Sequence, residues 1–258
     1  MKRLLFAMFA LSMLFSHGQS VMVVYEAETK SVPTFEKVMH QWMGAVKTVM
    51  NMEDARMRVF REQGTRKMQM VQWFDSLSEM AKHIEDQDAN QDKIGQTLQS
   101  MDPMPDGTWE KFTESTNFNE AAVWKYRPDL STTPQTFSPL SQEEKDKITY
   151  RRIQYMSVGV GQDDAFENWR KKVNTLDKDL GISFHMAVFE NVFGARGSNY
   201  MIILLDTSRF DYHKHWEERM KKRQANEAWT KFMESADNMS KWSVVREANW
   251  NQIVSLTF

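Results

Sequence analysis

The sequence predicts an α+β fold made of two tandem copies of one β-α-β-β-α-β unit. The motif Trp-x-Lys-Phe-x-Glu-Ser occurs at residues 109–115 and again at residues 229–235. Weaker matches follow in the same order along both halves, and each half alternates strand-like and helix-like patterns in the same sequence. An internal repeat of this length indicates duplication of a whole structural unit. The weaker matches are Tyr25 with Tyr155, Phe35 and Glu36 with Phe166 and Glu167, Asp75 with Asp206, and Ser76, Lys82, His83 and Glu85 with Ser208, Lys214, His215 and Glu217.

In the first copy, residues 21–26 are apolar and β-branched, which favours a strand. Ser31 or Thr34 can cap a helix in which apolar residues recur at spacings of three and four as far as Val49. A hairpin around Gly64 joins residues 56–61 to residues 67–74. A long polar helix at 76–99 and a last strand at 121–126 complete the copy.

The second copy repeats this order. Its predicted elements are a strand at 153–160, a helix capped by Asp163 or Asp164, a hairpin of 185–192 with 200–205, a helix that opens at Ser208 and a strand at 242–246. This order is the ferredoxin-like split unit, with two helices on one face of a four-stranded antiparallel sheet. The predicted domains are residues 21–127 and 148–258.

A semi-extended linker at 128–147 contains Pro128, Pro134 and Pro139 and joins the two domains. The first copy also carries an insertion at 101–107 that the second lacks. A sheet with helices on one face leaves its other face to be buried, and Tyr155, Val158, Phe189 and Ile203 are expected to supply apolar surface there. We therefore expect the two copies to form an intrachain pseudo-dimeric α+β barrel.

Residues 1–20 have the three-part pattern of a signal peptide: Lys2 and Arg3, an apolar run from Leu4 to Phe15, and a small polar stretch. The apolar run is shorter than the roughly 20 residues that span a bilayer. The prediction is export to the periplasm or the extracellular space, with no stable membrane insertion after cleavage. Cleavage before Gln19 and before Val21 are both compatible with the pattern.

The composition excludes several classes of site and partner. The sequence contains no cysteine, so neither disulfides nor thiolate zinc sites are available. Without Lys2 and Arg3, the 35 acidic residues outnumber the basic ones, which gives no general attraction for nucleic acid. The expected assembly is a monomeric pseudo-dimer or a homo-oligomer.

In both copies a strand ends in an Asp, Asp75 or Asp206, and a Ser follows one or two residues later, before a helix that contains Lys-His-x-Glu. This pattern resembles the dimeric α+β barrel superfamily, which includes antibiotic-biosynthesis-type monooxygenases, stress-responsive barrel proteins and NIPSNAP-like domains. Haem-degrading members of the superfamily carry a Trp followed ten residues later by an axial His. Here Trp216 is followed by Asn226, and no cofactor is predicted.

His83 and His215 recur at equivalent places and are the candidate catalytic residues, as acid–base groups; the alternative is that both pack between helix and sheet. His213 and Glu217 lie four residues apart, a spacing that suits a metal. The first copy lacks that histidine, so a surface ion pair is favoured and no metal is predicted. The mixed charges at 217–223 indicate a solvated helix face.

Six aromatic residues are candidates to line a ligand site, with packing in the core as the alternative. They are Tyr25, Trp42, Trp73, Tyr155, Trp169 and Trp216. The predicted function is an exported barrel protein that binds a small apolar molecule between sheet and helices. A cofactor-independent monooxygenase-like enzyme and a purely structural or interaction module are the alternatives, and the sequence leaves open whether the protein is an enzyme.

Overall fold

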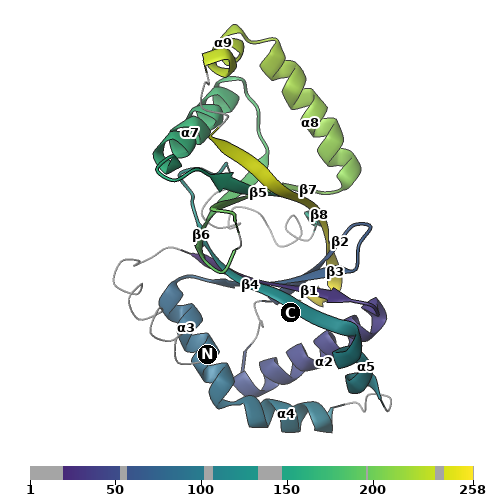
Figure 1. The fold of residues 1–258 in the computed structure, drawn as a ribbon. Helices are drawn as coiled ribbons and strands as arrows, with labels where there is room; N and C mark the ends of the chain where they lie inside the picture. Colours follow the sequence, from purple (N-terminus) through teal and green to yellow (C-terminus); the bar gives the residue numbers. More distant parts are fainter. Residues whose placement is uncertain are drawn as a thin grey trace. The chain divides into compact units, whose positions relative to one another are not determined.

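The computed structural model describes residues 20–52, 57–101, 107–132, 147–195, 197–235 and 241–257, with side chains as far as Ile253 (Figure 1). Nearly all of the predicted signal peptide, Arg56 and most of both the 101–107 insertion and the linker, including Pro134 and Pro139, lie outside these residues. The chain divides into two compact units. Unit 1 ends at Lys125 and also includes residues 253–258, and unit 2 comprises residues 126–252.

Unit 1 has the predicted order of elements. They are β1 (Val21–Thr29), α2 (Val32–Met50), β2 (Met57–Glu62), β3 (Lys67–Phe74), α3 (Leu77–Ala89), α4 (Gln91–Ser100), α5 (Thr108–Ser115) and β4 (Thr116–Tyr126). The pairings are antiparallel, and the described strands lie in the order β4-β1-β3-β2. The helices lie on one face of this sheet (Figure 1).

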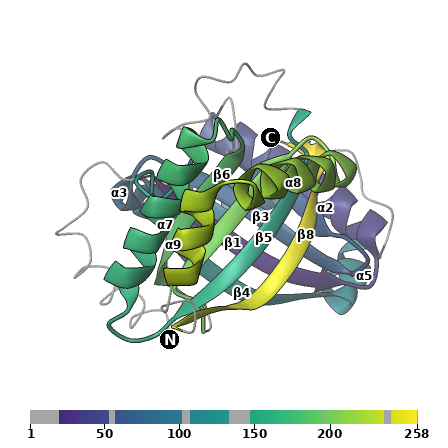
Figure 2. The ribbon, with the colours of Figure 1, turned by 90° about the horizontal axis from the view of Figure 1, so that it is seen from above.

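Unit 2 repeats the arrangement. Its elements are β5 (Tyr150–Val158), α7 (Asp163–Asp179), β6 (His185–Phe193), β7 (Tyr200–Asp206), α8 (Arg209–Gln224), α9 (Glu227–Ser235) and β8 (Trp242–Thr257). The described strands pair antiparallel in the order β8-β5-β7-β6. Figure 2 shows α7, α8 and α9 across one face of this sheet. The predicted α+β fold class with two ferredoxin-like units is confirmed.

The matched serines open equivalent helices. Ser76 Oγ accepts from the Glu79 N–H at 3.1 Å, and Ser208 Oγ accepts from the Asp211 N–H at the same distance. These N-caps satisfy backbone donors that a first helical turn leaves without partners. The single helix predicted at 76–99 is wrong, because α3 ends and α4 begins at Asn90, whose side-chain Nδ2 donates to the Asp86 carbonyl at 2.8 Å.

The matched phenylalanines occupy equivalent core positions. Phe35 in α2 and Phe166 in α7 are both fully buried, each in the cluster between the sheet and the helices of its own unit. Phe35 contacts Phe112, with ring centroids 6.0 Å apart, and Phe166 contacts Tyr200 at 4.6 Å. The repeat therefore preserves the residue around which each helix face is packed.

Two predictions about strand faces are wrong. Val158 packs in the helix-side cluster of unit 2 together with Met156, so it does not share a face with Tyr155. Tyr25 packs with Val21 and Val23 on the helix side of unit 1, so matching it to Tyr155 pairs residues on opposite faces. The reason is the two-residue period of a strand, which turns a shift of one residue into a change of face.

The solvated face predicted at 217–223 is also partly wrong. Arg219 and Arg223 in α8 are buried, whereas Glu217, Glu218 and the neighbouring lysines are exposed. The two arginines lie four residues apart on one side of the helix and contact aromatic rings. The mixed charge of this segment does not by itself show that one side of α8 is buried and the other is exposed.

None of the helices in the described part of the chain combines the length and the apolar character needed to cross a membrane.

Candidate functional site

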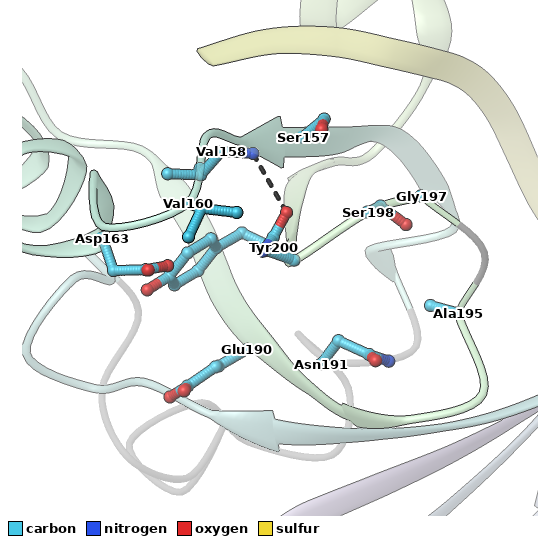
Figure 3. Close-up of a pocket in the computed structure, with 11 residues that line it drawn as sticks. Ser157, Val158, Val160, Asp163, Glu190, Asn191, Ala195, Gly197, Ser198 and Tyr200 are labelled. Carbon is cyan, nitrogen blue, oxygen red and sulfur yellow. Dashed lines mark hydrogen bonds between the residues drawn. The ribbon is translucent and has the colours of Figure 1, made fainter. Parts of the chain in front are cut away.

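A pocket of about 470 Å³ opens in unit 2 where β5 ends, α7 begins and the β6–β7 hairpin turns (Figure 3). Most of the side chains that line it are polar. They are Ser157, Asp163, Glu190, Asn191, Ser198, Asn199 and Tyr200, with Val158, Val160 and Ala195 as the apolar members. A site of this composition selects ligands by hydrogen bonding and charge.

Asn199 joins the hairpin to the end of β5. Its Oδ1 accepts from the Val158 N–H at 3.0 Å, drawn as a dashed line in Figure 3, and its own N–H donates to the Met156 carbonyl at 2.8 Å. Across the hairpin, the Asn191 N–H donates to the Asn199 carbonyl at 2.7 Å. Gly197 turns the chain with a φ of 72°, a conformation that glycine adopts without strain. These bonds fix the position of the pocket wall.

Tyr200 forms the inner side of the pocket. Its ring packs on Phe166, and its hydroxyl donates to Glu167 Oε1 at 3.1 Å. Burial and the nearby carboxylates of Glu167, Asp163 and Glu190 raise the pKa of Tyr200. The phenol therefore stays neutral at physiological pH and acts as a hydrogen-bonding group.

Arg127, just after β4, forms hydrogen bonds with three carboxylates at or near the pocket. Its guanidinium donates to the two carboxylate oxygens of Glu167 at 2.5 and 2.6 Å, to Glu190 at 3.1 Å and to Asp129 at 3.0 Å. Hydrogen bonding by Arg127 lowers the pKa of Glu167, and the bond to Glu167 raises the pKa of Arg127. Lys171 extends the network to Asp129 at 3.0 Å.

Asp163 stands in the first turn of α7, and its carboxylate lies beside the hydroxyl end of Tyr200 in Figure 3. The helix dipole stabilises a negative charge at this position. Among the described residues that line the pocket, the charged ones are Asp163 and Glu190, both acidic. These two carboxylates are suited to bind hydrogen-bond donors and positively charged groups. Within the same described residues, no group of three or more His, Asp or Glu could hold a metal ion.

The two candidate histidines have different surroundings. His215 Nδ1 lies 2.9 Å from Asp206 Oδ2, and its side chain is 48% exposed. His83 instead packs on Phe74, with ring centroids 5.2 Å apart. A carboxylate on one ring nitrogen orients an imidazole for acid–base work, so the structure favours His215 of the two. Neither residue lines the described pocket.

The six candidate aromatic residues lie in separate places. Trp169 and Trp216 pack against the helix-side core of unit 2, and Tyr25 and Trp42 pack against clusters in unit 1. Tyr155 lies under the Arg246 guanidinium at 4.9 Å, and Trp73 pairs with Met22 between β3 and β1. The six line no common described pocket, and their role in ligand binding stays a prediction.

Sequence reasoning missed the residues that form the pocket. The pattern predicts Asp163 only as a helix cap and Tyr200 only as part of a strand. The cap prediction is wrong, because Gln162 is the N-cap residue of α7 and Asp163 and Asp164 lie in its first turn. The available signal was the polar composition of the hairpin turn around Ser198 and Asn199. Asn226, which stands ten residues after Trp216, caps α9: its Oδ1 accepts from the Trp229 N–H at 2.9 Å.

No protein-family model and no curated protein matches the sequence. Solved structures do match the fold. A protein described as "Putative monooxygenase" from Fusobacterium nucleatum has a TM-score of 0.52 at 10% identity, covering 92% of this chain and 94% of that chain. One described as "Putative Chlorite dismutase" has a TM-score of 0.51 at 8% identity, covering 92% and 96%. Both structures have the dimeric α+β barrel fold, and this chain shares that fold.

Proposed function

We propose that the protein is an exported binding protein whose unit 2 pocket holds a small polar molecule that carries an ammonium group or several hydroxyls. The observation behind this proposal is the Asp163 carboxylate, which faces a pocket of about 470 Å³ next to the Tyr200 hydroxyl. A carboxylate beside amide and hydroxyl groups binds donors by charge-assisted hydrogen bonds, which are roughly twice as strong as neutral ones.

The neighbouring carboxylates support this assignment. Glu167 is engaged by both Arg127 and Tyr200, and Glu190 also contacts Arg127. Among the described residues, no arginine forms an ion pair with Asp163, and its carboxylate lies beside the Tyr200 hydroxyl in the pocket (Figure 3). Asn191, Ser157 and Ser198 add neutral polar groups around it, which favour a hydroxylated ligand over a hydrocarbon.

The apolar ligand predicted from the sequence requires a different site, between the sheet and the helices. In unit 2 that space is flanked by Trp169 and Trp216 and contains the fully buried Phe166. A ligand there would have to displace packed side chains. The polar pocket needs no such rearrangement, which is why we favour it.

The experiment compares Asp163→Asn with Asp164→Asn. Both residues lie in the first turn of α7, but only Asp163 lines the pocket. We expect native mass spectrometry or calorimetry with a panel of small amines and polyols to identify a ligand whose binding weakens about tenfold or more in D163N and is unchanged in D164N. Equal affinities in the two variants, or binding only of apolar panel members, would reject the pocket as the site.

An oxygenase activity is the second candidate, and the His215–Asp206 pair is the feature that favours it. The shared fold with the "Putative monooxygenase" structure is compatible with this activity. The test is oxygen consumption with electron-rich phenols in the absence of added cofactor, comparing the wild type with His215→Ala and His83→Ala. Loss of consumption in the first variant only would support an acid–base role for His215.

Export is part of the proposal, and the position of β1 helps to choose the cleavage site. Val21 begins β1 and is 1% exposed. Cleavage before Val21 would place the charged amino group on a buried residue, which is costly. We therefore expect the intact mass of secreted protein to match a chain that starts at Gln19, and a chain that starts at Val21 would contradict this argument.

A further inference from the structure

Three arginines are buried together on the helix side of unit 2. Arg170 in α7 and Arg219 and Arg223 in α8 are each more than nine-tenths buried. Electrostatic coupling links Arg170 to Arg223 and to Asp177, and links Arg219 to the same two residues and to the Asp206 carboxylate. The carboxylate that forms hydrogen bonds within this cluster is Asp177, also buried.

Arg223 makes full use of one edge of its guanidinium. Its Nε donates to Asp177 Oδ1 at 2.8 Å and its Nη2 donates to Asp177 Oδ2 at 2.6 Å. Two parallel hydrogen bonds of this kind match the two oxygens of a carboxylate. Arg223 is thus an arginine of this cluster whose Nε and Nη2 both have a hydrogen-bond acceptor.

Arg219, one helical turn earlier, presents the same edge without a partner. Within the described residues, its Nε and Nη2 are buried and donate to no hydrogen-bond acceptor. The rings of Phe184, Trp216 and Tyr212 lie around the guanidinium, with centroids at 4.6, 5.5 and 5.8 Å. Aromatic faces attract the charge, but they supply no acceptor to the N–H edge.

Arg170 is the other arginine of the cluster that forms no hydrogen bond to Asp177 among the described residues. Its Nη2 donates to Asn174 at 2.7 Å, and its buried Nε has no partner in the described part of the chain. Burial lowers the pKa of Arg170 to about 10, so the group remains a cation at neutral pH. A buried cation whose N–H groups lack an acceptor is unfavourable, and a bound anion would offset this cost.

We propose that Arg219 binds a small oxyanion, a carboxylate or a phosphate, through its Nε and Nη2. The anion occupies the position that Asp177 occupies on Arg223, and Arg170 contributes long-range attraction. The edge is covered in the structure, so binding requires a neighbouring side chain to move. Trp216 and Phe184, which are only partly buried, are the rings placed to do so.

Thermal unfolding of the mature protein in sodium phosphate, sodium benzoate and sodium chloride at matched ionic strength tests the proposal. We expect phosphate or benzoate to raise the midpoint above that in chloride, with the preferred anion distinguishing an inorganic from an organic ligand. The variant Arg219→Lys keeps the positive charge but loses the planar pair of N–H donors. It should therefore need at least about tenfold more anion for the same rise in the unfolding midpoint. Arg219→Met should show no rise at all.

Arg209→Met is the matched control, because Arg209 lies at the start of the same helix and is exposed. Its response to the anions should equal that of the wild type. Midpoints in phosphate and benzoate no higher than in chloride, or an anion response that persists in R219M, would overturn the proposal. If R219M does not fold, calorimetric titration of the wild type and R219K with phosphate and benzoate replaces it, and equal anion affinities in the two proteins would overturn the proposal.

Discussion

Partly buried ionic contacts hold the side chains beside the candidate pocket, and Glu167 is at their centre. It accepts from Arg127 and from Tyr200, and its side chain is largely buried. Glu167→Gln removes the charge and leaves Arg127 with weaker partners. We expect a loss of about 2 kcal/mol in the free energy of unfolding, whereas Asp164→Asn, in the same helix, should change it by less than about 0.5 kcal/mol.

The same residue gives a pH dependence. Hydrogen bonding by Arg127 lowers the pKa of Glu167 in the folded state. Its contribution to stability is therefore present above the unfolded pKa of about 4.3 and is lost as the pH falls through the lower folded value. Urea unfolding of the wild type and E167Q between about pH 3 and pH 7 should give a stability difference that is constant near neutrality and shrinks in acid. A difference that grows in acid would contradict this assignment.

At the level of elements, the repeated motif is used differently in the two units. In α5 the phenylalanine, Phe112, is buried and Trp109 is 37% exposed, whereas in α9 Trp229 is the buried residue at 9%. Phe232 packs only partly against the core of unit 2. The shared motif therefore packs with a different residue pointing inward in each unit.

Alanine substitutions test this exchange of roles. We expect Phe112→Ala and Trp229→Ala each to cost about 3 kcal/mol, and Trp109→Ala and Phe232→Ala to cost clearly less. Unfolding followed by circular dichroism measures the four values. Equal losses for Trp109→Ala and Trp229→Ala would show that the two short helices pack alike.

The order of elements could be predicted from the sequence because hydrophobic periodicity and caps such as Ser76 and Ser208 are local signals. Strand ends were less predictable. The strand β8 begins at Trp242 as expected but runs to Thr257, well beyond the predicted end at Arg246. Its polar residues continue the pairing, since Asn251 pairs with Tyr150 in β5. Backbone pairing with a neighbour extends a strand that its own composition would not.

At the scale of the whole molecule, the two units share a fold but differ in their buried charge. The Arg127–Glu167 network, the Arg223–Asp177 pair and the polar pocket all lie in unit 2. Each unit has its own apolar core, which it needs for folding. The polar groups of unit 2 are additional to that core and are available for ligand binding. Sequence reasoning found the shared core and missed this difference, because it weighted the residues common to both copies.

The most direct test of the account is a ligand titration of isotope-labelled mature protein, followed by backbone amide shifts in NMR spectra. With the best ligand from the amine and polyol panel, we expect the largest shifts at Val158, Asn191, Asn199 and Tyr200, the residues that form the pocket wall. Shifts centred in unit 1, or on the aromatic residues between the unit 2 helices and sheet, would contradict the assignment of the binding site.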